Sequence, residues 1–150
     1  MGILREHLRD ELVLTQLVVD SAESLIHLLA QKAEPWSGVE GHTLETAVMS
    51  RQQDGTTGVG NRVAIPHGRM RHLEDVVLVV ANTKQAIDFN SEDGEGVHLI
   101  FMLIVPKNNN LLYLKLLAKI SLLCSDKKTR ELLISAETPR EIIDIVEEVD

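Results

Sequence analysis

The residues most suited to carrying out a chemical reaction are the tripeptide Pro66-His67-Gly68 and the arginine that follows it, Arg69. A short apolar run ends at Pro66, whose ring fixes the backbone and should leave the next side chain at a strand end. We expect Gly68 to turn the chain sharply and to leave its amide open to an anion. A neutral imidazole is a nucleophile near pH 7, and arginine or amide donors stabilise a phosphoryl group in transfer. These residues favour a phosphorylated histidine with Gly68 and Arg69 as phosphate contacts, although a histidine beside a turn with no chemical role is the simpler alternative.

The glycine-rich stretch before this tripeptide does not fit a nucleotide-binding loop. A P-loop would need Lys and Ser or Thr where Asn61 and Arg62 stand. A dinucleotide fingerprint would need a third glycine where Val63 stands. Both nucleotide motifs are therefore excluded.

The first half of the chain is predicted to contain a strand followed by two helices. Residues 12–19 are apolar and β-branched, which favours a strand. Asp20, with Glu23 three residues later, has the spacing of a capping box, so we expect a helix to begin there and to end by Gly38. Thr43 is a candidate N-cap for the second helix. One strand and two helices are thus expected ahead of the candidate histidine.

The second half is predicted to contain two buried strands and three helices. Residues 76–80 and 97–105 are apolar runs too short for typical helices, which favours strands. The asparagines at 108–110 follow the second run and offer an N-cap. Helices are expected over residues 111–122, around 129–134, and from the N-cap Thr138 onward. This pattern predicts an α/β domain with a central sheet covered by helices.

The run from Thr57 to Gly68 resembles the active-site signature of the enzyme IIA domains of the phosphoenolpyruvate-dependent phosphotransferase system, in its fructose, mannitol and nitrogen-regulatory branch. That signature reads roughly S/T-G-I-G-x-G-I-A-I-P-H-G, and here the sequence reads TGVGNRVAIPHG. Segments 86–89, 96–101 and 116–118 resemble later parts of the domain, so the resemblance covers essentially residues 1–150 as a single domain. It implies a mixed central β-sheet flanked by helices on both faces.

The resemblance also implies roles for individual residues. By it, His67 is the phosphorylated nucleophile and Arg51 is an active-site arginine that stabilises the phosphoryl group. Arg62 departs from the pattern because the family usually has glycine there, and it would add a cation near the site or restrict the loop. Asn110 stands where many members carry a second histidine. We treat both as candidate phosphate contacts, with helix capping as an equal alternative for Asn110.

Composition excludes several other classes of protein. The chain of 150 residues has 15 basic and 23 acidic residues and only 3% aromatic residues, which argues against a nucleic-acid partner. One cysteine, Cys124, excludes an intrachain disulfide framework and fits a reducing compartment. The apolar stretch at 100–106 is too short to cross a bilayer. We expect a cytoplasmic protein without membrane insertion, metal or cofactor.

These observations predict a phosphocarrier that receives its phosphoryl group on His67 from a histidine-phosphorylated carrier protein. A regulatory, nitrogen-branch-like role is favoured because the chain contains neither a IIB nor a membrane IIC domain. Its further partners would be regulatory target proteins or a IIB subunit. Two alternatives stay open: the IIA subunit of a fructose- or mannitol-type sugar transporter, and a regulatory binding module that is never phosphorylated.

Overall fold

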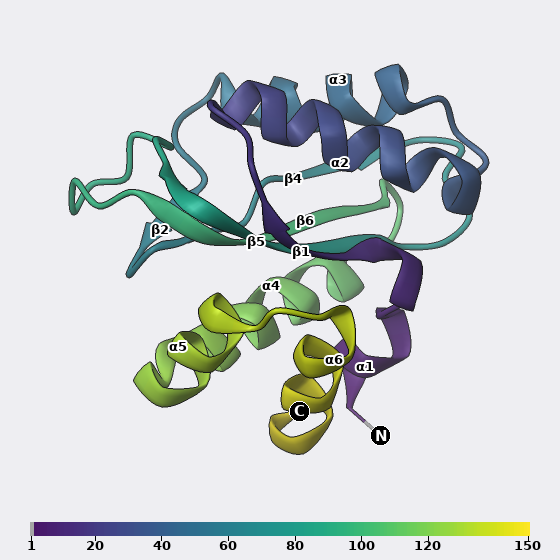
Figure 1. The fold of residues 1–150 in the computed structure, drawn as a ribbon. Coiled ribbons are helices and arrows are strands. Elements are labelled where there is room, and N and C mark those ends of the chain that lie inside the picture. Colours follow the sequence, from purple (N-terminus) through teal and green to yellow (C-terminus); the bar gives the residue numbers. More distant parts are fainter. Residues whose placement is uncertain (1) are drawn as a thin grey trace.

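A mixed sheet of six strands lies between two layers of helices in the structure, a computed structural model that describes residues 2–150 (Figure 1). The strand order is β1-β5-β6-β3-β2, and β4 also pairs with β6. The strands are β1 (Val13–Leu17), β2 (Gly58–Gly60), β3 (Val63–Ala64), β4 (His67–Met70), β5 (Val77–Ile87) and β6 (Val97–Pro106). The predicted fold class is confirmed.

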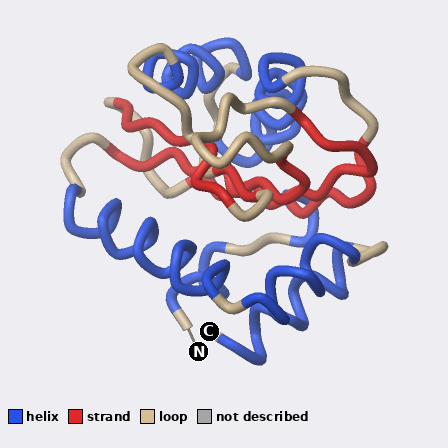
Figure 2. The backbone as a smooth tube through the Cα atoms, turned by 90° about the vertical axis from the view of Figure 1, so that its left-hand side faces the viewer, coloured by secondary structure: helices blue, strands red, loops and turns tan. Residues whose placement is uncertain are grey.

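Helices cover both faces of this sheet, as the view in Figure 2 shows. One layer consists of α2 (Ala22–Ser37) and α3 (Gly41–Gln52). The other layer consists of α1 (Ile3–His7), α4 (Asn110–Ser125), α5 (Lys127–Ser135) and α6 (Pro139–Val149). A short 3-10 turn at Asp10–Leu12 leads from α1 into β1. No helix among residues 2–150 has the length and apolar character needed to cross a membrane.

The central strand β6 explains how one strand serves both helical layers. Its side chains alternate: Leu99, Phe101 and Leu103 join the core beneath α4, α5 and α6, whereas Ile100 and Met102 join the core beneath α2 and α3. This is the period of two that a β-strand imposes. Because both faces are covered, the strand is apolar without interruption from Leu99 to Pro106, as is typical of central strands in covered sheets.

Several helix ends differ from the sequence prediction by a few residues. Ser21, not Asp20, caps α2, because its hydroxyl accepts a hydrogen bond from the Ser24 amide at 3.0 Å. The second helix begins before the predicted cap Thr43, since the Glu40 carbonyl already accepts from the amides of Thr43 and Leu44. Thr138 does cap α6, as predicted.

The strand β5 is longer than the predicted strand over 76–80. It continues through Thr83 to Ile87, and its exposed residues 84–86 lie where the register of β5 against β6 shifts, between Asn82 and Ile87. Polar residues end the apolar run in this region, so the sequence predicted a strand that stops too early.

Candidate functional site

His67 is the first residue of β4 and lies beside the central strand, paired with Leu103. Its side chain is half-buried. The ring nitrogen Nδ1 lies 2.7 Å from the carbonyl oxygen of Ile65. A carbonyl can only accept a hydrogen bond, so Nδ1 carries the proton in the neutral ring. The lone pair is then on Nε2, which is the nucleophilic atom of this histidine.

Three features of its surroundings change the pKa of His67. Burial lowers the pKa, the hydrogen bond to Ile65 raises it, and the nearby guanidinium groups of Arg51 and Arg69 lower it; the net shift is downward from 6.5. The imidazole is therefore neutral at pH 7 and keeps its lone pair available. Two cations beside a neutral nucleophile form an arrangement that can attract and hold a tetrahedral anion.

Arg69 is held beside His67 by two residues at the start of α4. Successive strand residues point to opposite faces, so Arg69 and His67 share one face of β4. The Arg69 guanidinium donates to the Asn110 side-chain oxygen at 2.8 Å, and its Cζ lies 5.1 Å from the ring centroid of Tyr113. The Tyr113 and His67 rings are 5.6 Å apart, tilted by 54°. The structure thus brings His67, Arg69, Asn110 and Tyr113 together.

Arg51 reaches the same place from the opposite helical layer. It lies in the last turn of α3, and its guanidinium donates to the Gly55 carbonyl at 3.0 Å. The pKa of Tyr113 is raised by burial, an effect partly offset by Arg69 and Arg51. Both arginines therefore act on the same two rings. We call Arg51, His67, Arg69, Asn110 and Tyr113 the His67 cluster.

Gly68 does not turn the chain, contrary to the prediction. It lies inside β4, pairs with Ile104, and is buried. A Cβ atom built at this position would meet the Ala47 carbonyl oxygen at 2.7 Å. The glycine is needed because β4 passes directly against the backbone of α3. Its effect is to bring β4, and with it His67, close to the helix that carries Arg51.

Asn110 does not cap α4, so the capping alternative was wrong. The cap is Asn109, whose side-chain oxygen accepts from the Leu112 amide at 3.2 Å. Asn110 is the first helical residue, and its side chain is free to accept from Arg69. Because Asn109 caps the helix, the side chain of Asn110 is left to bind Arg69.

Arg62 lies away from the His67 cluster. It precedes Val63, which pairs with Leu99, whereas His67 pairs with Leu103. These two positions on β6 are about 13 Å apart at roughly 3.3 Å per residue. The Arg62 side chain points to His98, with Nε 3.4 Å from Nδ1 of that ring. The prediction that Arg62 adds a cation near the site is wrong, because the turn between β2 and β3 lies at the other end of β6.

Arg62→Gly is expected to stabilise the fold. Asn61 and Arg62 link β2 to β3 with φ angles of 55° and 70°, the left-handed region in which a side chain such as that of arginine is strained. Glycine is the preferred second residue of such a turn. We expect a gain of about 0.5–1 kcal/mol in the free energy of unfolding, measured by urea denaturation. Asn61→Gly, as the control, should gain less, because asparagine tolerates this region; a loss of stability in Arg62→Gly would contradict the strain.

The His67 ring is expected to titrate below pH 6.5, its ordinary midpoint, because its pKa is lowered in the folded protein. Replacing one cation with Arg51→Gln should move the midpoint upward, as NMR of the imidazole protons would show. The unfolded chain binds this proton at higher pH than the folded chain. The contribution of His67 to the free energy of unfolding should therefore fall as the pH drops through 6.5. A midpoint above 6.5 in the unaltered protein would contradict the arrangement of charges.

Tyr113 is the member of the His67 cluster that sequence reasoning missed. The signal was present, because Tyr113 lies three residues after Asn110 and residues at that spacing share a helix face.

Among residues 2–150, no group of three or more His, Cys, Asp or Glu side chains is arranged to hold a metal ion.

Comparison with known proteins identifies relatives along the whole chain. The family model described as phosphoenolpyruvate-dependent sugar phosphotransferase system, EIIA 2, matches residues 6–149. A nitrogen regulatory protein of Bradyrhizobium diazoefficiens is 33% identical over 136 residues, which cover 91% of this chain and 89% of that protein. The fructose-specific EIIABC component of Bacillus subtilis is 31% identical over 104 residues, 69% of this chain and 16% of that protein.

A solved structure has the same fold. The crystal structure of the nitrogen regulatory protein IIA-Ntr from Neisseria meningitidis superimposes with a TM-score of 0.92 at 28% sequence identity. The superposition covers 97% of this chain and 99% of that one.

Proposed function

Because the chain belongs to the EIIA 2 family of the phosphoenolpyruvate-dependent sugar phosphotransferase system, we propose that it accepts a phosphoryl group on Nε2 of His67. The donor is a histidine-phosphorylated carrier protein, and the role is regulatory. The observation that carries this proposal is the hydrogen bond from Nδ1 of His67 to the Ile65 carbonyl at 2.7 Å. It fixes the ring and leaves Nε2 as the free nucleophile.

The transfer exchanges one nitrogen–phosphorus bond for another. The Nε2 lone pair of His67 forms a bond to phosphorus while the bond to the donor imidazole breaks, and the donor nitrogen keeps that electron pair. Phosphorylated His67 then carries positive charge in its ring, and the Nδ1 proton remains hydrogen-bonded to Ile65. Arg51 and Arg69 hold the phosphoryl oxygens and stabilise their negative charge in the transition state.

Asn110 and Tyr113 position Arg69 in this scheme. An arginine with a single anchor would sample many rotamers, whereas this one has a hydrogen bond on one side and an aromatic face on the other. The side chain of Asn110 does not titrate near neutral pH, unlike the histidine that the family resemblance implies at this position. Arg69 therefore keeps its place at any pH at which His67 is neutral.

The regulatory role is supported by the nitrogen regulatory proteins among the relatives, of which the one from Bradyrhizobium diazoefficiens matches over 89% of its own length. The second candidate is the IIA part of a fructose-type transporter, favoured by the match to the Bacillus subtilis component. The partners would be regulatory target proteins in the first case and a IIB subunit in the second. We place the exchange in the cytoplasm, which suits a chain whose single thiol, Cys124, is free and buried.

The proposal is tested by incubating the protein with phosphoenolpyruvate, enzyme I and the phosphocarrier protein, followed by intact mass spectrometry. We expect the mass of one phosphate to be added, to be lost in acid and to survive base, as is the case for phosphohistidine. Omitting the carrier should abolish the addition. No added mass in the complete mixture would instead favour the binding module without phosphorylation.

Asn110→Asp is expected to slow phosphoryl transfer without weakening the fold. The new carboxylate would pair with Arg69 at the present 2.8 Å contact and repel the incoming phosphoryl group. A tenfold slower transfer corresponds to about 1.4 kcal/mol, and we expect an effect of at least that size in the initial rate. An acidic residue in the first helical turn should leave the melting temperature unchanged or raise it. The matched control is Asn108→Asp, which adds the same charge outside the helix; equal rates for the two variants would remove Asn110 from the site.

A further inference from the structure

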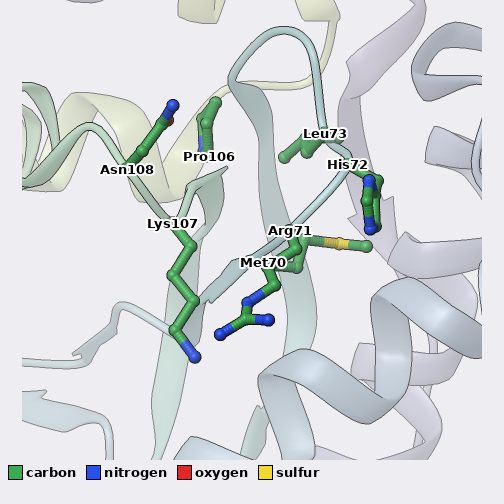
Figure 3. Close-up of a pocket in the computed structure, with 7 residues that line it drawn as sticks. All are labelled: Met70, Arg71, His72, Leu73, Pro106, Lys107 and Asn108. Atoms are coloured by element: carbon green, nitrogen blue, oxygen red, sulfur yellow. The ribbon is translucent and has the colours of Figure 1, made fainter.

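A hollow of about 590 Å³ opens where β4 and β6 end, outside the His67 cluster (Figure 3). Its apolar part is formed by Met70, Leu73 and Pro106. Its polar rim is formed by Arg71, His72, Lys107 and Asn108. Small-molecule sites in proteins usually measure about 300–1,000 Å³. This strand-end hollow therefore has the size of a site for a small organic molecule.

Two cations of the rim have no acidic partner. The side chains of Arg71 and Lys107 project to the same side of the hollow in Figure 3. Neither forms an ion pair with a carboxylate anywhere in residues 2–150. The net charge of the chain is −8, so acidic side chains are abundant, yet none neutralises this pair. Two like charges on one hollow favour an anion there.

The acidic residues closest in sequence face elsewhere. Glu74 and Asp75 follow in the same loop, but they line a different hollow, together with Arg9 and Trp36. Within this loop, Arg71 thus lines the strand-end hollow, whereas the carboxylates of Glu74 and Asp75 line the other hollow. This separation leaves the positive potential of the strand-end hollow uncancelled.

The backbone holds the two loops of the hollow in fixed positions. Met70 pairs with Pro106 at the end of the parallel strands β4 and β6, and the Lys107 amide donates to the Met70 carbonyl at 2.9 Å. The crevice outside the carboxyl ends of parallel strands is a common place for ligands in α/β sheets. A hollow with a fixed frame loses little entropy when a ligand binds.

The strand-end hollow is separate from the His67 cluster although both use β4. Met70 packs into the core beneath α2 and α3, whereas His67 and Arg69 face α4. We propose that the strand-end hollow binds a small organic anion, with a phosphate or carboxylate head on Arg71 and Lys107 and a short carbon skeleton on Met70, Leu73 and Pro106. Arg71 supplies the planar fork that matches such a head, and Lys107 supplies a point charge.

The test measures binding without any phosphoryl donor, so its outcome is independent of the function proposed for His67. The isotope-labelled protein is titrated with glycerol 3-phosphate, succinate, inorganic phosphate and glycerol, and backbone amide shifts are followed by NMR. We expect saturable shifts at Arg71, His72 and Lys107 with glycerol 3-phosphate or succinate, and the stronger of the two identifies the head group. Inorganic phosphate should bind about tenfold more weakly because it lacks a skeleton, and glycerol should not bind.

Variants show which residues are responsible for binding the anion in the strand-end hollow. Arg71→Ala with Lys107→Ala should weaken binding by about tenfold or more, and Arg71→Gln with Lys107→Gln should do the same while keeping the side-chain bulk. Lys115→Ala removes an exposed lysine of α4 and should leave binding unchanged. Shifts centred on His67 and Arg69, or binding by both double variants as strong as that of the unaltered protein, would overturn the proposal. It would also be overturned if an acidic peptide bound to this hollow while none of the small anions did.

Discussion

His67→Ala is expected to abolish phosphoryl acceptance completely. No other residue of the His67 cluster offers a nitrogen nucleophile, because the arginines are protonated and the Asn110 amide has no basic lone pair. The fold should survive, since His67 is half-buried and its polar contact is a single hydrogen bond to a carbonyl. Intact mass after incubation with the complete donor mixture measures the loss, and thermal melting measures the fold.

The control for this experiment is His42→Ala. His42 is exposed near the start of α3, and its variant should accept phosphate at the full rate. If His67→Ala still gained the mass of a phosphate, the assignment of the acceptor would be wrong. If it melted far below the unaltered protein, His67 would be a structural residue instead.

Asn82→Leu is expected to cause the largest loss of stability. Asn82 is fully buried in β5, and its amide nitrogen donates to the carbonyls of Leu133 and Ala136 at 2.9 and 2.8 Å. Its side-chain oxygen accepts from the Gln16 amide at 2.6 Å. Leucine has a similar size but leaves these backbone groups without that partner in the interior. The cost should be about 3 kcal/mol, since each buried unsatisfied group costs about 1–3 kcal/mol.

This asparagine also explains an irregularity in the sheet. The pairing of β1 with β5 shifts between Leu14 and Leu17, where Gln16 has a φ of 56° and loses its regular ladder partner. The side chain of Asn82 replaces that partner. Urea denaturation of Asn82→Leu measures the loss, with Gln85→Leu as the control on an exposed position of the same strand. Equal stability of the two variants would show that the bulge does not depend on the buried amide.

The fold could be predicted to the extent that hydrophobic burial determines it. The strand over 97–105 and the final helix after Thr138 were found closely, because one is an unbroken apolar run and the other has a capping signal that nothing competes with. The strands β2 and β4 were not predicted as strands, and β3 was predicted only as a short apolar strand that ends at Pro66. They are two to four residues long, and they are held by pairing with each other or with β6 rather than by their own composition.

The candidate site was predicted where it depends on one segment and missed where it depends on packing. The sequence already indicates His67 and, through the family resemblance, Arg51. The environment of Asn110 depends on Asn109 taking the cap, a choice between neighbouring asparagines that the sequence leaves equal. The true place of Arg62 depends on the register of β3 against β6, which no local pattern reveals. Long-range register and capping competition are therefore the physical limits of the sequence prediction.

Tyr113 gives the His67 cluster a built-in optical reporter. It is the single tyrosine of the chain, and its ring lies 5.6 Å from that of His67 and 5.1 Å from the Arg69 guanidinium carbon. The near-ultraviolet absorption of a phenol responds to charges placed close to its ring. The single tryptophan, Trp36, lies in α2 with Arg9 over its ring, in the other helical layer. A difference spectrum in the tyrosine band would therefore follow the charge state of His67 in real time, in the unlabelled protein.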